Sequence, residues 1–153
     1  MMPGDDQLEA EAKALKTALD AIDRYPRGAC GHCAELLAYH LHRRFGIVPD
    51  YVSGIFFRGV AEKETGHAWI EWNGLTIDIS GDQFGWPPVI AARGSIYHAS
   101  GEIDLRYPWK LDAAWWEEQC GEIWKAAEPS LSPEANTSPA RRLDLLQARP
   151  QSL

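Results

Sequence analysis

The chain has 153 residues, which is enough for one domain with a single hydrophobic core. Its hydrophobic content of 45% and charged content of 24% are typical of a globular protein in water. A formal net charge of −7 argues against nucleic acids and anionic membrane surfaces as partners, because both attract basic proteins.

The N-terminal region is acidic and is expected to form a helix. The stretch MMPGDDQLEAEAK lacks the charged-then-apolar profile of a signal peptide, and no apolar run in the chain approaches the roughly 18 residues that span a bilayer. We therefore expect a cytoplasmic protein whose three cysteines stay reduced. Apolar residues at helical spacing, from Leu8 to Ile22, predict a first helix from about Gln7 to Arg24.

A second helix is expected from about Ala29 to Phe45, and it opens on Cys30-Gly31-His32-Cys33. These letters also occur in dithiol redox enzymes, but there the motif follows a buried strand, whereas here a helical pattern and RYPRG precede it. Zinc could be held by Cys30, His32, Cys33 and His67, although structural zinc sites usually pair two short clusters. The remaining interpretation is one nucleophilic thiol at Cys30, with Cys33 a small core residue one turn later.

One strand and then a hairpin of two further strands are expected next in the chain. Residues 50 to 60 are rich in β-branched and aromatic side chains, and AEKETG after them is expected to be a polar loop. In HAWIEWNGLTIDIS, Asn73-Gly74 predicts a two-residue hairpin turn that pairs Trp72 with Leu75 and Ile70 with Ile77. One face of this hairpin is then entirely apolar. Its opposite, non-core face carries His67, Trp69, Glu71, Thr76, Asp78 and Ser80.

The remaining segments are expected to hold one more helix and a tail. GDQFGWPPVIAARG, residues 81 to 94, is interpreted as a loop. A last helix is predicted from about Leu111 to Ala127, and the Pro- and Ser-rich residues 128–153 are predicted to be a mobile tail. The expected organisation is therefore a single domain over residues 1–127 followed by that tail.

Three side chains have the types and placement of a cysteine nucleophile with its helpers. Cys30 is expected at a helix N-terminus, where free N–H groups and the helix dipole favour a thiolate. His67 lies diagonal to Asp78 on the predicted hairpin. The Cα atoms of such a pair are about 7–8 Å apart, which lets the two side chains form a hydrogen bond. A histidine that accepts the thiol proton and a carboxylate that orients it would complete a triad.

The stretch from Arg27 to about Phe84 resembles the transglutaminase-like branch of the papain-like cysteine enzymes. The resemblance lies in GAC opening the helix AELLAYHLHRRFGI, then in YVSG, GHAWIEW and IDIS. It implies an α+β fold with a papain-like core, in which a central helix packs on a small antiparallel sheet with extra flanking helices. It also implies that Cys30 is the nucleophile, His67 the general base and acid, and Asp78 the orienting carboxylate. The gap of 11 residues between the last two is shorter than in many members, which a tight turn would explain.

The expected function is that of a cysteine-dependent hydrolase or acyl transferase, a peptidase, amidase or deamidase acting on an amide bond through a thioester. Its substrate is expected to be a peptide or protein, with Trp69 and Trp86 shaping the groove, and no metal or cofactor is expected. Cys33 could replace Cys30, and Asp82 could replace Asp78. Two other classes stay open: a thiol–disulfide oxidoreductase using both cysteines, and a non-catalytic binding module of the same fold. The substrate, the fate of the thioester and the oligomeric state are not specified by the sequence.

Overall fold

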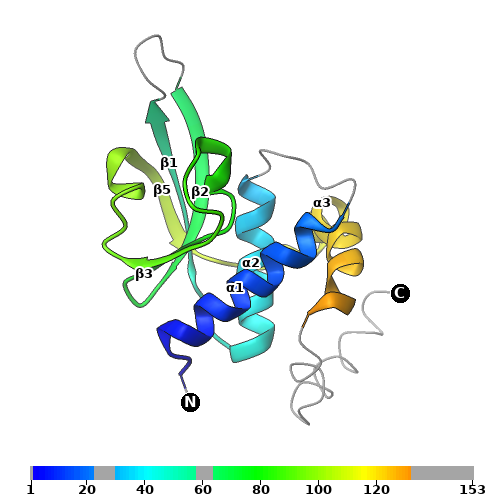
Figure 1. Ribbon diagram of the computed structural model, residues 1–153. Coiled ribbons are helices and arrows are strands. Elements are labelled where there is room, and N and C mark those ends of the chain that lie inside the picture. Colours follow the sequence, from blue (N-terminus) through cyan, green and yellow to red (C-terminus); the bar gives the residue numbers. More distant parts are fainter. Residues whose placement is uncertain (1, 23–29, 58–63, 132–153) are drawn as a thin grey trace.

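The protein has an α+β fold in which two helices pack against a five-stranded antiparallel sheet and a third helix packs on those two (Figure 1). The computed structural model describes residues 2–22, 30–57 and 64–131. The helices within them are α1 (Asp5–Asp20), α2 (Cys30–Phe45) and α3 (Ala113–Ala127). The strands are β1 (Asp50–Phe57), β2 (Glu64–Trp72), β3 (Leu75–Asp78), β4 (Ile90–Arg93) and β5 (Glu102–Pro108). Within these ranges no helix combines the length and apolarity needed to cross a bilayer.

The hairpin of β2 and β3 has the predicted turn and register. Trp72 pairs with Leu75, and Ile70 pairs with Ile77. Asn73 and Gly74 have φ angles of 49° and 82°, so both turn residues adopt the left-handed conformation that this tight turn requires. The full strand order is β4-β3-β2-β1-β5, so the chain returns after β4 to place β5 at the far edge beside β1.

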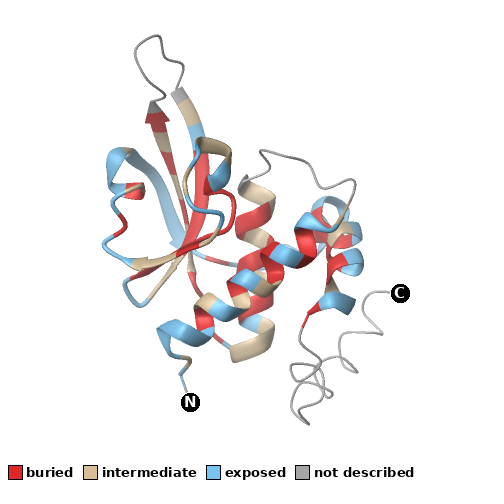
Figure 2. Ribbon diagram, in the orientation of Figure 1, coloured by how far each residue is buried: buried red, intermediate tan, exposed pale blue. Residues whose placement is uncertain are grey.

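The main core lies between the sheet and the helices. The apolar hairpin face buries Ala68, Ile70, Leu75 and Ile77, as expected, and α2 packs directly on β2. Figure 2 shows the buried positions running along α2 and the adjoining strand. Cys33 is 2% exposed and belongs to this cluster, which confirms it as a small core residue.

The opposite face of the sheet is also buried, which corrects the expectation of a non-core face. Val52, Phe56 and Trp69 form a second cluster there, with Trp86 packed against it. The segment between β3 and β5 folds over this face and brings the rings of Phe84, Trp86 and His98 onto it. His67 and Asp78 therefore face an aromatic interior instead of water, whereas Glu71 stays partly exposed and pairs with Arg106.

Several elements differ from the sequence-based expectation. α1 ends at Asp20, before the predicted end at about Arg24. β2 begins at Glu64 because Thr65 and Gly66, placed in a loop, pair with β1. Residues 81–94, interpreted as a loop, contain the 3-10 turn η1 (Gly81–Phe84) and β4, and β5 has no counterpart among the predicted elements. β4 is defined by its pairing with β3. β5 pairs with β1, and its alternation of Ile103, Leu105 and Tyr107 with polar residues is a strand signal that the sequence analysis did not use. At the C-terminal end, Leu131 is buried in the main core, so the packed chain extends past 127; the rest of the predicted tail, 132–153, lies outside the described residues.

Replacing Gly101 by alanine is expected to lower the free energy of unfolding by about 1–3 kcal/mol, the usual cost of an overpacked site. A Cβ on Gly101 would overlap the ring of Phe56 and lie 2.7 Å from the backbone oxygen of Ile55, which cannot move aside cheaply. Urea unfolding followed by circular dichroism measures the change. Gly66→Ala is the matched control, since its Cβ would meet nothing within 4 Å; equal effects at the two positions would contradict the prediction.

Candidate active site

The site is built around the carboxylate of Asp78, the last residue of β3. The Nε2 atom of His67, on β2, lies 2.6 Å from Asp78 Oδ2. The structure thus brings together two of the three residues proposed from the sequence, and it does so by the diagonal placement that the hairpin register predicts. Both side chains are almost completely buried, with exposed fractions of 1% for each residue.

Asp78 also binds a second histidine, which the sequence analysis did not identify. His98 Nε2 lies 2.6 Å from the same oxygen, Asp78 Oδ2. The other ring nitrogen of His98, Nδ1, lies 2.6 Å from Ser95 Oγ. The second oxygen of the carboxylate, Oδ1, accepts the backbone N–H of Ser80 at 2.8 Å. His98 lies in the 3-10 turn η2 (His98–Ser100), within a segment that shows no periodicity, so only the tertiary structure reveals its role.

The hydrogen bonds define the protonation of the network. Burial alone would raise the pKa of Asp78, but the hydrogen bonds from His67 and His98 outweigh it and hold this pKa well below its usual range. An ionised carboxylate only accepts hydrogen bonds, so both Nε2 atoms must carry a hydrogen. In a neutral imidazole the other nitrogen, Nδ1, is then an acceptor. In His67 this atom faces the side-chain amide Nε2 of Gln83 at 3.0 Å.

Aromatic rings enclose the His67 imidazole. Phe84 and Trp86 meet it edge to face, with centroid distances of 4.9 and 5.5 Å, and Trp69 lies 5.8 Å away. Trp69 is 1% exposed and packs beneath the histidine, whereas Trp86 keeps part of its surface exposed. Of the two tryptophans proposed for a substrate groove, Trp86 is therefore the one with surface to offer.

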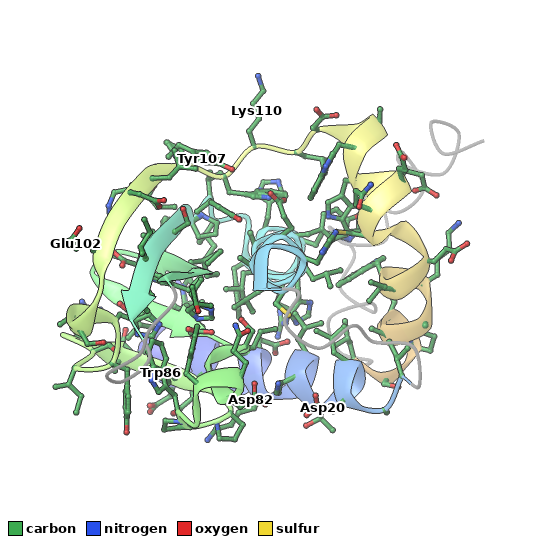
Figure 3. All side chains as sticks on the ribbon, turned by 90° about the horizontal axis from the view of Figure 1, so that it is seen from above. Asp20, Asp82, Trp86, Glu102, Tyr107 and Lys110 are labelled. Carbon is green, nitrogen blue, oxygen red and sulfur yellow. The ribbon has the colours of Figure 1, made fainter. Side chains whose placement is uncertain are left out.

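A chain of contacts links His67 to α1. Gln83, which bonds His67, follows Asp82, and Asp82 Oδ2 forms an ion pair with Lys16 Nζ at 2.9 Å. Burial opposes the charge of Lys16, but Asp82 and then Asp20 raise the pKa of this lysine. α1 and η1 therefore meet here; Figure 3 shows Asp82 beside α1.

Cys30 is the first residue of α2, as the nucleophile hypothesis requires. Its side chain lies outside the part of the chain that the structure describes.

Two alternative assignments lose support in the described geometry. Asp82 is bonded to Lys16 and is half exposed, so Asp78 and not Asp82 orients His67. The zinc set of Cys30, His32, Cys33 and His67 required two histidines at one ion. Instead, His32 stacks on Trp115 and lies 3.3 Å from Gln119 through Nε2, whereas His67 bonds Asp78 and Gln83.

A different group of residues has the composition of a metal site. One ligand atom from each of His67, Asp78 and His98 lies within 4.8 Å of the others, and all three residues are buried. Two histidines and one carboxylate suit a divalent transition metal. Asp78 Oδ2 already accepts both ring N–H groups, however, so an ion would have to replace two protons that the network holds in place.

Comparison of the chain with protein-family models, with curated proteins and with solved structures produced no match in any of the three. The case for a function therefore depends on the geometry of the site itself.

Proposed function

We propose that the protein is a cysteine-dependent hydrolase or acyl transferase of papain-like, transglutaminase-like architecture that acts on an amide bond. Cys30 is its nucleophile, His67 its general base and acid, and Asp78 its orienting carboxylate. One observation supports this most: Asp78 holds His67 Nε2 at 2.6 Å, so that Nδ1 is the acceptor. This is the protonation state that a general base needs before it accepts a thiol proton. His67 lies on β2, the strand on which α2 packs, and α2 begins with Cys30.

In the proposed reaction, the Gln83 amide releases His67 Nδ1 when substrate binds. Cys30 Sγ then attacks the carbonyl carbon of the amide while its proton passes to that Nδ1. Backbone N–H groups at the start of α2 stabilise the oxyanion, with Gln83 as an additional donor beside the imidazole. The C–N bond then breaks, and His67 returns the proton to the leaving amine. Water or a second amine attacks the resulting thioester, which releases an acid or a new amide and restores the thiol.

The buried carboxylate contributes by remaining charged when the histidine becomes an imidazolium. His98 and the Ser80 N–H group help to keep Asp78 ionised despite its burial. The attraction between carboxylate and imidazolium is stronger in this dry environment than it would be in water.

Trapping the acyl-enzyme is the direct test of this proposal. On incubation with p-nitrophenyl acetate, the protein is expected to release nitrophenolate in a burst and to gain one acetyl group by mass, mapped to Cys30 by peptide digestion. Cys30→Ala should lose the adduct, and Cys33→Ala should retain it. Added amine should convert the acetyl group into an acetamide if the enzyme is a transferase.

Each alternative gives a different result in the same experiment. Loss of the adduct in Cys33→Ala with retention in Cys30→Ala would move the nucleophile to Cys33. Absence of any cysteine adduct, together with disulfide exchange that needs both cysteines, would support the oxidoreductase. A protein inert in both assays would contradict the enzyme proposal and favour a binding module.

A further inference from the structure

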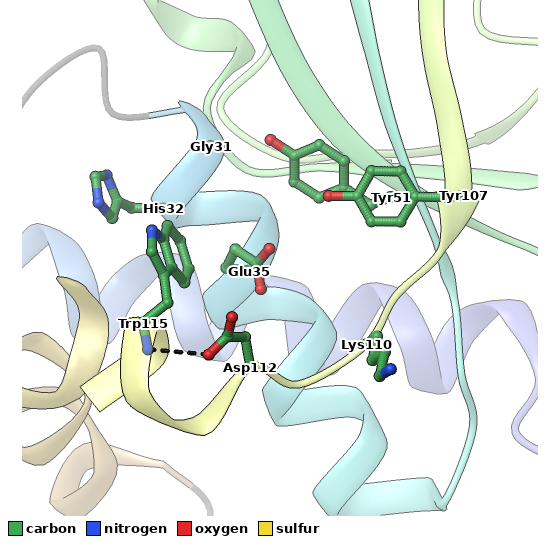
Figure 4. Close-up of a pocket in the computed structure, with 8 residues that line it drawn as sticks. All are labelled: Gly31, His32, Glu35, Tyr51, Tyr107, Lys110, Asp112 and Trp115. Atoms are coloured by element: carbon green, nitrogen blue, oxygen red, sulfur yellow. Dashed lines mark hydrogen bonds between the residues drawn. The ribbon is translucent and has the colours of Figure 1, made fainter. Parts of the chain in front are cut away.

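A second concave site lies at the N-terminal end of α2, on the sheet face that α2 covers. It is a cavity of about 380 Å³, and its lining includes Gly31 and Glu35 of α2 with Tyr51 and Tyr107 of two adjacent strands (Figure 4). The loop before α3 and its first turn close the other side with Asp112 and Trp115. This volume lies within the range of small-ligand sites, roughly 300–1,000 Å³.

The charge inside the cavity is negative and only partly compensated. Glu35 is half-buried, and Oε2 accepts the indole N–H of Trp109 at 2.7 Å. Burial raises the pKa of Glu35, with the Trp109 hydrogen bond opposing the rise. Among the residues that the structure describes, no cation forms an ion pair with Glu35. Lys110 belongs to the lining, but its side chain points outward from the molecule (Figure 3).

A second carboxylate and three aromatic rings complete the surroundings of Glu35. Asp112 caps α3 by accepting the N–H of Trp115 at 3.2 Å and lies beside Glu35 in Figure 4. Tyr51 and Tyr107 stack with a centroid distance of 5.2 Å, and Trp115 stacks on His32 at 6.0 Å. Aromatic faces attract ammonium and guanidinium groups, and a desolvated carboxylate pairs with them directly.

We propose that this cavity binds the cationic side chain of a peptide, a primary ammonium or guanidinium group, with Glu35 as its ion-pair partner and the tyrosines and Trp115 as its walls. Aromatic walls suit the methylene stem of such a side chain, while the charged end reaches the carboxylate. Asp112 adds a second negative charge to the lining. A neutral apolar ligand of the same shape would leave the half-buried carboxylate without a cation.

The cavity adjoins the proposed nucleophile through the chain itself. Gly31, which follows Cys30, belongs to the lining, and a Cβ on Gly31 would lie 3.4 Å from the Tyr51 hydroxyl. A basic side chain in the cavity would therefore bring its peptide past the start of α2. The role of the cavity in choosing a substrate rests on the proposed function, whereas its binding of cations does not.

Binding can be measured without catalysis, in the full chain carrying Cys30→Ala. The probes are the N-acetyl methylamides of lysine, arginine, norleucine and glutamate, titrated calorimetrically. We expect the lysine or arginine probe to bind at least about tenfold more tightly than norleucine, as one charge-assisted contact implies, and the glutamate probe to show no binding. Glu35→Gln should reduce the affinity for the cationic probe about tenfold, while its amide oxygen can still accept the Trp109 hydrogen bond.

Matched variants separate binding from folding. Asp112→Asn retains the helix cap, because asparagine caps as well as aspartate, and should weaken cation binding severalfold. Glu117→Gln removes an exposed charge of α3 and should leave binding unchanged. Equal affinity for lysine, arginine and norleucine, or full affinity in folded Glu35→Gln and Asp112→Asn, would overturn the proposal. Because the assay uses Cys30→Ala, failure of the acyl-enzyme test leaves this result intact, and failure here leaves the acyl-enzyme test intact.

Discussion

Replacing His67 by glutamine is expected to return Cys30 to the reactivity of an ordinary thiol. An imidazole that accepts the proton stabilises the thiolate, so alkylation of the wild-type protein by iodoacetamide should reach its plateau below about pH 7. In His67→Gln the midpoint should move up to about 8.5, the value of a free cysteine. The rate at pH 6 should fall about tenfold, since the loss of thiolate is partly offset by the higher nucleophilicity of a more basic one.

The other two cysteines do not obscure this measurement. Burial raises the pKa of the Cys120 thiol to about 12, so it is not ionised at the pH of the assay. The thiol of Cys33 is removed by measuring every variant in a Cys33→Ala background. His42→Gln is the matched control, because His42 bonds the backbone oxygen of Ile47 at the far end of α2. A midpoint that is the same with and without His67 would show that this histidine does not activate the thiol.

Replacing Asp78 by asparagine is expected to lower the free energy of unfolding by about 3 kcal/mol. Two ring N–H groups and one backbone N–H converge on this carboxylate in a buried site. An amide presents only one oxygen, so at least one buried donor loses its acceptor. Guanidinium unfolding measures the loss. Asp104→Asn makes the same chemical change at an exposed strand position and should alter stability by less than about 0.5 kcal/mol; a similar loss in both variants would contradict the prediction.

The same carboxylate should make the protein sensitive to acid. The pKa of Asp78 is lowered in the folded protein, from about 3.9 in an unfolded chain. Below about pH 4 the unfolded state therefore binds more protons than the folded one, and the free energy of unfolding decreases as the pH is lowered. This contribution is fully present above about pH 5. The free energy of unfolding of Asp78→Asn should fall less steeply under acid, so the two curves should converge.

The hairpin shows how local sequence information suffices for part of the site. Asn73-Gly74 specifies a two-residue turn, and the turn specifies the register of β2 against β3. Alternation of side chains then places His67 and Asp78 on one face. Each of these steps concerns neighbours in the chain, which is why the pair could be predicted without coordinates.

The partners of that pair depended on long-range packing. His98 is 20 residues from Asp78, and Gln83 is 16 residues from His67. Gln83 belongs to a short 3-10 turn that was interpreted as a loop, and no spacing rule connects either residue to the hairpin. Their positions follow from close approaches, such as Gly81 against Trp86 and Gly101 against Phe56, that exist only in the folded chain.

Turn chemistry and side-chain alternation act over a few residues, so local sequence was enough to predict the helix that begins at Cys30, the tight hairpin and the pairing of His67 with Asp78. Folding of the whole chain adds the burial of the polar hairpin face, the second histidine on the carboxylate and the negatively charged cavity beside Gly31. These features could not be predicted because burial and charge neighbours arise when segments far apart in the chain pack together.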